Sequence, residues 1–291
     1  MGTLMIDDPV FELLMPNDLT VVVDVGANPI DGEPPYKQML TKRLCRVVGF
    51  EPQNEALAQL NASKTDLETY LPDVVGDGTV ATLHVCNASG MTSIFEPDPS
   101  RLMLFRKFQQ WGTVKNKIQV QTHRLDDISQ IKKIDFLKMD IQGAELSVLK
   151  NGHEKLARAV AIQTEVSFVP FYKGQPSFGE IDMELQKQGL ILHGIGFLEK
   201  RLIGPMHDID DDKAGNNQVV WTDMVYVRDF SRPELMDSEQ LKHLALIAHH
   251  CYRSVDLAMN CIFHLTKRQI IPGDGCSRYE AILRKLPARS S

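Results

Sequence analysis

Short runs of β-branched and other apolar residues alternate with amphipathic stretches through the first 230 residues. The apolar runs predict strands over residues 20–24, 46–50, 79–86, 135–139 and 160–164. The amphipathic patterns predict helices over 36–43, 102–111 and 178–188, and one that begins near 54. This alternation is typical of a doubly wound α/β sheet. Two later runs, 190–197 and 219–227, predict an antiparallel pair that completes a mostly parallel, seven-stranded sheet.

The pattern changes after Phe230. Between Leu241 and Leu265 apolar residues recur at intervals of three and four, which predicts one long amphipathic helix or two joined helices. Asp237 or Ser238 is suited to cap its start. We therefore expect a cofactor-binding domain over residues 1–230 and a C-terminal helical extension over 231–291. The apolar face of the extension must pack on the sheet, on a second copy in a homodimer, or on a substrate.

The ends of the first two predicted strands indicate a nucleotide-like ligand. The first strand ends at Asp24 and is followed by Gly26, where the missing side chain leaves room for a ligand. The second ends at Glu51, whose carboxylate can accept hydrogen bonds from both hydroxyls of a ribose. A dinucleotide site requires a second and a third glycine after Gly26, and both are missing. No P-loop motif occurs either. The pattern favours S-adenosylmethionine, which has an adenosine and no phosphates.

Ligands of open α/β sheets bind outside the carboxyl ends of the strands. We expect Asp24 with Gly26 beside the methionine part of the cofactor, Glu51 at the ribose, and Asn87 with Ala88 at the adenine edge. Asn28 is also expected to bind the cofactor. Asp140 and Glu165 end the next two predicted strands, towards an acceptor, and Asp140 is also close enough to touch the cofactor. Three of these residues have simpler interpretations: Asp140 as a helix cap, Asn87 as a turn former and Glu165 as a solvated turn residue.

The segment from Asp135 to Glu145, D-F-L-K-M-D-I-Q-G-A-E, closely resembles a motif of the FkbM-type methyltransferases. The segments Asp24 to Asn28, Glu51-Pro52 and Thr164-Glu165 are also similar to that family. The resemblance extends over about residues 18–228. It implies a class I, Rossmann-like methyltransferase fold and an S-adenosylmethionine-dependent O-methyltransferase whose acceptor is a hydroxyl of a sugar, a polyketide or a similar small molecule or glycan.

Methyl transfer to a hydroxyl requires alignment of the two reactants and removal of the hydroxyl proton. Asp140 is the first candidate base, Glu165 the second and His193 the third. A divalent metal ion could instead lower the pKa of the hydroxyl. The acid-rich segment from His207 to Asp212 has oxygen ligands that suit such an ion, but it lacks the spacing of a known cation loop. We interpret it as a surface loop and predict no metal site.

Two other classes of protein share parts of this pattern. A nicotinamide-dependent oxidoreductase would have the same first two strand ends, although the missing glycines count against it. A non-catalytic binding protein on a methyltransferase fold would lose Asp140 and Glu165, which are both present.

The composition indicates which kinds of partner and which cellular compartment to expect. The net charge of −6 gives no electrostatic footprint for nucleic acid. The five cysteines are odd in number and scattered, without a C-x-x-C pair, which favours a reducing cytoplasm. No apolar run is long enough to span a membrane, so we expect neither a nucleic-acid nor a membrane partner.

Overall fold

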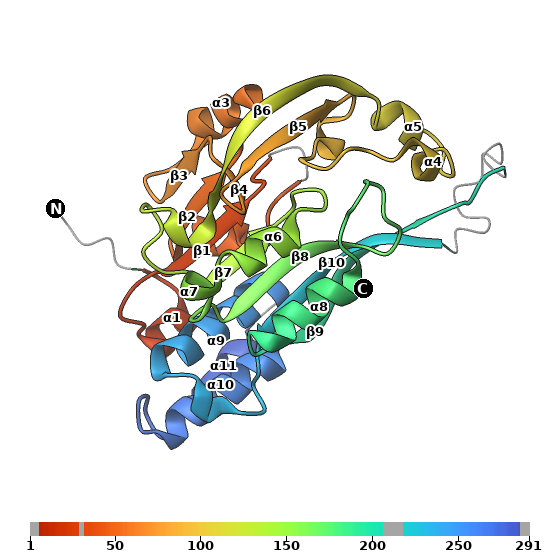
Figure 1. The fold of residues 1–291 in the computed structure, drawn as a ribbon. Helices are drawn as coiled ribbons and strands as arrows, with labels where there is room; N and C mark the ends of the chain where they lie inside the picture. Colours follow the sequence, from red (N-terminus) through yellow and green to blue (C-terminus); the bar gives the residue numbers. More distant parts are fainter. Residues whose placement is uncertain (1–5, 29–31, 206–217, 286–291) are drawn as a thin grey trace.

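Seven strands form the central sheet in the order β3-β2-β1-β7-β8-β10-β9 (Figure 1). The computed structural model describes residues 6–28, 32–205 and 218–285. The strands of this sheet are β1 (Thr20–Val25), β2 (Cys45–Phe50), β3 (Glu68–Leu71), β7 (Phe136–Met139), β8 (Ala161–Ser167), β9 (Leu190–Arg201) and β10 (Gln218–Arg228). Neighbours from β3 to β8 pair in parallel, whereas β10 is antiparallel to both β8 and β9. The predicted doubly wound, mostly parallel sheet with an antiparallel closing pair is confirmed.

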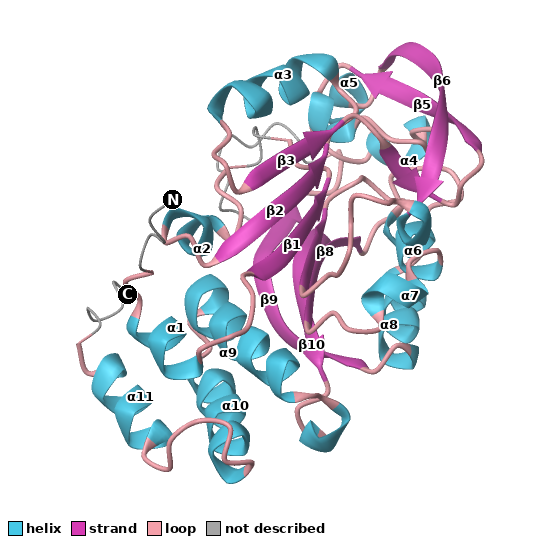
Figure 2. Ribbon diagram, turned by 90° about the vertical axis from the view of Figure 1, so that its left-hand side faces the viewer, coloured by secondary structure: helices cyan, strands magenta, loops and turns pink. Residues whose placement is uncertain are grey.

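Helices cover both faces of the sheet (Figure 2). One layer contains α1 (Pro9–Leu14), α2 (Lys37–Thr41), α9 (Ser238–Tyr252), α10 (Val255–Lys267) and α11 (Gly275–Leu283), and the other contains α6 (Glu145–Lys150), α7 (His153–Leu156) and α8 (Phe178–Lys187). Val22 of β1 packs in the core of the first layer, whereas Val23 and Val25 pack in that of the second. Burial on both faces explains why this strand is a continuous apolar run.

The third strand of the central sheet is not the predicted one. Residues 79–86 form β5 (Val80–Cys86) in a separate sheet of three strands, with β4 (Val74–Gly76) and β6 (Val114–Arg124). The third position in the central sheet belongs to β3, a four-residue edge strand in which no residue is fully buried. An alternating pattern shows that a segment is a strand, but it does not show which strand it pairs with.

The remaining helices are short or lie at the surface. α3 (Asn54–Ser63) begins where predicted, but none of its residues is fully buried. The expected helix over 102–111 is two short helices, α4 (Pro99–Leu102) and α5 (Phe108–Trp111). They surround an aromatic cluster that also contains Phe171 and Trp221.

The C-terminal region forms helices that pack against the sheet. Asp237 caps α9 by accepting a hydrogen bond from the Gln240 backbone N–H at 2.9 Å. Eleven of the fifteen residues of α9 are buried, because the sheet covers one side and α10, α2 and α1 pack on the others. The helical run breaks at Arg253, whose φ is +50°, so two joined helices form instead of one.

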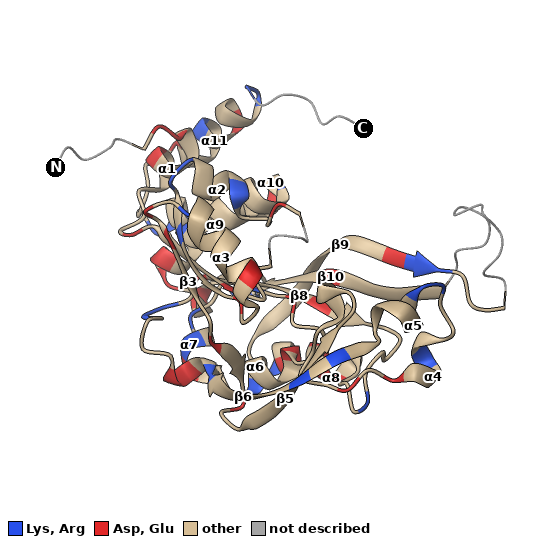
Figure 3. Ribbon diagram, turned by 90° about the horizontal axis from the view of Figure 1, so that it is seen from above, with Lys and Arg blue, Asp and Glu red and all other residues tan. Residues whose placement is uncertain are grey.

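No helix among the described residues is long and apolar enough to cross a membrane. Lys and Arg residues are interspersed with Asp and Glu residues over the described elements (Figure 3).

Candidate functional site

The strand order reverses between β1 and β7, and the carboxyl ends of these strands form the centre of the site. Gly26 follows β1 with φ +83°, and a Cβ built on it would lie 2.0 Å from the Asp140 carbonyl oxygen. The backbone N–H groups of Gly26 and Ala27 both donate to the Phe50 carbonyl at 3.0 Å. The glycine is therefore required by the backbone that follows β7, in addition to any ligand.

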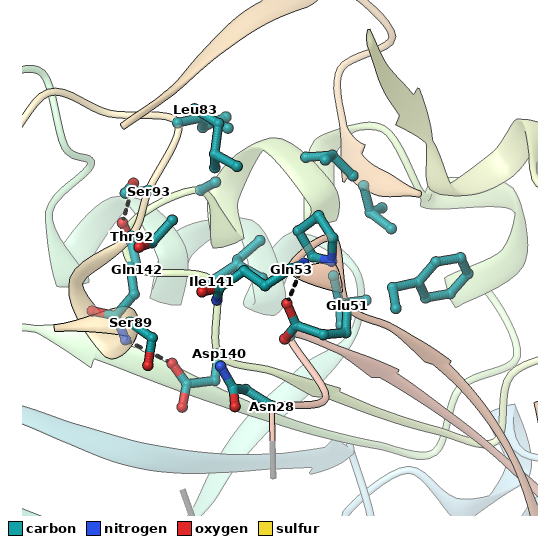
Figure 4. Close-up of a pocket in the computed structure, with 18 of the residues that line it drawn as sticks. Asn28, Glu51, Gln53, Leu83, Ser89, Thr92, Ser93, Asp140, Ile141 and Gln142 are labelled. Atoms are coloured by element: carbon teal, nitrogen blue, oxygen red, sulfur yellow. Dashed lines mark hydrogen bonds between the residues drawn. The ribbon is translucent and has the colours of Figure 1, made fainter. Parts of the chain in front are cut away.

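A pocket of about 680 Å³ lies beside this point (Figure 4). Its polar lining consists of Asn28, Glu51, Gln53, Asp73, Ser89, Thr92, Ser93, Asp140 and Gln142. Asn28, Asp140 and Glu51 lie along one side in Figure 4, and Leu83 lies opposite them. The Glu51 side chain is buried, and its Oε1 accepts a hydrogen bond from the Gln53 backbone N–H at 2.7 Å.

Asn87 and Ala88 are not among the residues that line this pocket. The Asn87 side chain instead donates to the Gln110 carbonyl at 2.8 Å, which agrees with the alternative interpretation as a turn residue. The corresponding side of the pocket is formed by Asp73 and Val74, just after β3. Asp73 was not predicted, because the third strand of the sheet was expected at 79–86; the signal was an acid two residues beyond a short strand.

Asp24 does not line the pocket but lines the adjoining groove, and it has charged and polar partners. Its carboxylate accepts a hydrogen bond from the Tyr36 hydroxyl at 2.5 Å and lies 3.4 Å from the Lys138 ammonium group. Lys138 also donates to the Gly26 carbonyl at 3.3 Å. Burial, together with the Asp24 charge, raises the pKa of Tyr36, so its hydroxyl stays a donor. This network fixes the end of β1 and the turn at Gly26.

The loop after β7 is held from inside by a buried carboxylate. Glu145 Oε1 accepts backbone hydrogen bonds from Ile141 at 3.2 Å and Gly143 at 3.1 Å. Burial, with a contribution from the Asp140 charge, raises the pKa of Glu145 to about 7. Gln142 donates to Asp140 Oδ1 at 2.8 Å and accepts a hydrogen bond from Ser93 Oγ on its carbonyl at 2.7 Å. The Asp140 carboxylate is thereby oriented at the pocket wall.

A second, larger groove of about 2140 Å³ shares Asn28 and Asp140 with the pocket. Its charged and amide lining includes Asp24, Lys138, Gln163, Glu165 and Asp223 on the strands and Asp140 just after β7. The aromatic residues Tyr36, Tyr70, Phe197 and Trp221 also line the groove. Asp24, Lys138 and Gln163 are neighbours across three strands, and Glu165 is directly opposite Asp223. Phe136 and Ala161 lie two residues earlier on the same face, in the core formed with α9. The helices therefore cover the first half of this face and leave its polar half as the groove.

Two acidic residues of this groove were placed differently, or not at all, by the predictions from the sequence. Glu165 lies inside β8, not at its end. Asp223 of β10 was not predicted, although an acid inside the apolar run 219–227 was a signal. Its pKa is raised by burial and by the Asp140 charge, and its Oδ2 accepts a hydrogen bond from Gln163 Nε2 at 3.2 Å.

His193, the third candidate base, lines neither cavity. Its Nε2 is 2.9 Å from Ser254 Oγ, at the start of α10, and burial lowers its pKa. Among the residues that the structure describes, no group of three His, Cys, Asp or Glu side chains is placed to hold a metal ion. The acid-rich segment His207 to Asp212 lies outside them.

The chain matches the family model described as the methyltransferase FkbM domain over residues 24–192, more than half of its length. It is also similar to the 2-O-methyltransferase NoeI of Sinorhizobium fredii (strain NBRC 101917 / NGR234), with 29% identity over 164 residues. That match covers 53% of this chain and 66% of the relative, just under two thirds of the relative's length.

Two solved methyltransferases are distantly similar. Magnesium protoporphyrin IX methyltransferase from Synechocystis PCC 6803, solved with bound SAM, is 10% identical with a TM-score of 0.38, over 76% of this chain and 74% of that one. Precorrin-6y C5,15-methyltransferase from Geobacter metallireducens GS-15 is 8% identical with a TM-score of 0.37, over 75% and 85%. The fold assignment rests on the strand order of the structure itself.

Proposed function

Because the chain belongs to the FkbM methyltransferase family, whose cofactor is S-adenosylmethionine, we propose that it transfers a methyl group to a hydroxyl of a sugar, a polyketide or a similar small molecule or glycan. The observation that carries this proposal is the junction of the two cavities at Asn28 and Asp140. A methyl donor in the pocket and an acceptor in the groove would meet there. Proximity and alignment are the main contributions a protein makes to transfer from an already activated donor.

The charge of the pocket supports this donor. The described residues that line it include the carboxylates Glu51, Asp73 and Asp140 and no Lys, Arg or His. The sulfonium and ammonium groups of S-adenosylmethionine are cations, which such a lining attracts. A dinucleotide pyrophosphate would face the same carboxylates without a cation to offset them. The missing glycines and the acidic lining both count against the nicotinamide alternative.

We assign the parts of the cofactor from the positions of these residues. Glu51 binds the ribose hydroxyls, and Gly26, Asn28 and Asp140 contact the methionine part. Asp24 acts from behind them through Lys138 and the Gly26 turn. Asp73 takes the place at the adenine that the sequence analysis gave to Asn87 and Ala88.

Transfer to a hydroxyl also needs a proton acceptor, and the groove offers carboxylates for it. Asp140 and Glu165, the two predicted catalytic residues, both line the groove. O-methylation in particular is supported by NoeI, which is a 2-O-methyltransferase; a carbon or nitrogen acceptor would not require these carboxylates in the same way.

The experiment is methyl transfer from labelled S-adenosylmethionine to a panel of methyl glycosides, phenols, amines and thiols. We expect label in hydroxyl-bearing acceptors, with S-adenosylhomocysteine released in equal amount. Label that enters only amines or thiols would refute O-methylation. Cofactor binding without transfer to any acceptor would favour the non-catalytic alternative.

A further inference from the structure

The C-terminal extension reaches the acceptor groove through a chain of hydrogen bonds. Tyr252, the last residue of α9, donates from its hydroxyl to Gln163 Oε1 at 2.9 Å. Gln163 Nε2 donates in turn to Asp223 Oδ2 at 3.2 Å. The three residues come from α9, β8 and β10, so the chain joins the helical layer to the polar half of the sheet.

The direction of this chain is fixed by the chemistry of its ends. An ionised carboxylate only accepts hydrogen bonds, so the Gln163 amide must present its NH₂ group to Asp223. Its carbonyl oxygen then points to Tyr252, which can only satisfy it by donating. The Tyr252 ring is itself held edge-on against Phe136, with ring centroids 6.1 Å apart at 75°. Two partners therefore orient one amide, and the amide orients the carboxylate.

Charged and titratable groups surround Asp223 across the sheet. Glu165 is opposite it on the neighbouring strand β8. Lys138 of β7 and Asp140, which follows β7, act on its charge from one strand further across. On β9 the neighbour is Gly196, whose missing Cβ would lie 3.3 Å from the Asp223 Cβ. Burial and the Asp140 charge raise the pKa of Asp223, whereas Lys138 and the Gln163 hydrogen bond oppose that rise. A raised pKa improves a carboxylate as a proton acceptor near neutral pH.

We propose that Asp223 is the general base that accepts the proton of the acceptor hydroxyl, and that Gln163 and Tyr252 are positioning residues that orient it. This inference rests on the proposed O-methylation. In the step, the acceptor oxygen forms a bond to the methyl carbon while the methyl–sulfur bond breaks. The electron pair of that bond returns to sulfur, giving neutral S-adenosylhomocysteine, and the hydroxyl proton passes to Asp223.

Asp140 is less suited to this role than the sequence suggested. Its carboxylate lies at the wall of the cofactor pocket as well as in the groove. At the pocket wall it stabilises the cationic end of the donor. Asp223 lines only the acceptor groove.

The location of the proposed base explains why a family motif did not identify it. Asp223 and Tyr252 both lie outside the segment 24–192 that matches the family model. The base and one of its positioning residues would therefore be features of this chain's C-terminal third.

The first test is a pH titration of the Asp223 carboxyl group, monitored by carbon-detected NMR. It uses the full-length protein bound to S-adenosylhomocysteine, and Asp223→Asn assigns the signal. We expect a midpoint above the ordinary 3.8. Tyr252→Phe should raise it further by about half a pH unit to one pH unit, because a loosened amide supports the ionised carboxylate less well. Tyr226→Phe is the matched control. Tyr226 is on β10, the strand of Asp223, but its hydroxyl donates to Asp182 instead. An unchanged midpoint in Tyr252→Phe would overturn the positioning role.

The second test is turnover with the best hydroxyl acceptor of the panel. Asp223→Asn should lower kcat by about 10²–10⁴-fold and remove the acid limb of the pH profile, with S-adenosylhomocysteine affinity unchanged. Tyr252→Phe should lower kcat by about tenfold or less and move that limb upward with the NMR midpoint. Near-normal turnover in Asp223→Asn, with loss in Asp140→Asn or Glu165→Gln, would assign the base to one of those residues and overturn the proposal. If the wild type methylates no hydroxyl at all, the proposed function and with it the base assignment fail, while the titration still decides the positioning role.

Discussion

Gly26 shows how a single residue type joins two strands at the site. Its φ of +83° is a left-handed conformation that favours glycine, and the Asp140 carbonyl occupies the place of a Cβ. We expect Gly26→Ala to lower the free energy of unfolding by about 3 kcal/mol, from strain and the displaced backbone together.

Chemical denaturation measures this loss, and Gly194→Ala is the matched control. Gly194 lies in β9, has no positive φ and has no atom within 4 Å of an added Cβ. Equal stabilities of the two variants would show that the β1–β7 contact does not constrain residue 26.

Glu145 gives a prediction with a definite sign. Its pKa is about 7 in the folded protein against an ordinary 4.5, so the folded state keeps its proton over a range in which the unfolded chain has lost it. The stability that the protonated form contributes is complete below pH 4.5 and is lost as the pH rises to about 7. At ~1.4 kcal/mol per pH unit the loss is about 3 kcal/mol.

Glu145→Gln cannot ionise and should escape this loss. The variant should gain stability relative to the wild type as the pH rises from about 5 to about 8 in urea unfolding. Glu180→Gln is a control of opposite sign, because hydrogen bonds from the Ser177 backbone and hydroxyl lower the Glu180 pKa. The stabilising charge of Glu180 is present at neutral pH, so Glu180→Gln should not raise the stability of the protein there. A pH-independent difference between wild type and Glu145→Gln would contradict the assignment.

At the scale of elements, burial decided what the sequence could predict. β1, β2 and β7 are enclosed by other parts of the protein, so their apolar runs and the positions of Asp24, Glu51 and Asp140 could be predicted. The edge strand β3 is short and half-exposed, and its pattern gives no such signal. Because β3 was missed, so was Asp73.

Pairing and tertiary contacts account for the rest of what was missed. The β5 pattern is a strand pattern, but its partner β6 becomes visible only in the folded chain. Asp223 enters the site because antiparallel pairing brings it opposite Glu165. Tyr252 reaches the groove through Gln163, a contact that joins residues 89 positions apart.

The packing of α10 can be tested with two neighbouring residues. Leu265 is completely buried in the core that the C-terminal helices share with the sheet, whereas Phe263 is 52% exposed. Leu265→Ala should cost about 2–5 kcal/mol, as truncation in a well-packed core does. Phe263→Ala, the matched control, should change stability by less than about 0.5 kcal/mol. Similar losses in both variants, measured by thermal unfolding, would indicate that another copy of the chain covers Phe263 in solution.

The exposure of Phe263 concerns the oligomeric state of the whole molecule. The apolar stripe of the C-terminal helices is already covered within the chain, by the sheet, by α1 and α2 and by the helices themselves, so the stripe does not require a partner subunit. The predicted homodimer through these helices stays a prediction, and the exposed Phe263 on α10 is the residue through which it is tested.

The whole-molecule prediction concerns which cofactor the protein accepts. The pocket combines Glu51, Asp73 and Asp140 with no basic residue among the described residues that line it. We expect S-adenosylmethionine and S-adenosylhomocysteine to bind in calorimetry and NADH to give no signal, because its pyrophosphate would be repelled. Glu51→Ala should weaken S-adenosylhomocysteine binding by about 1.5–3 kcal/mol, the usual contribution of hydrogen bonds to a charged group.

Asn87→Ala is the matched control for that substitution, since its side chain donates to the Gln110 carbonyl and lies outside the pocket lining. Its affinity for S-adenosylhomocysteine should equal that of the wild type. A loss of binding in Asn87→Ala would return the adenine to the position first predicted from the sequence, and unchanged binding in Glu51→Ala would remove Glu51 from the ribose. Tight NADH binding would refute the assignment of the pocket, because three carboxylates without a cation cannot favour a dianionic pyrophosphate over a sulfonium.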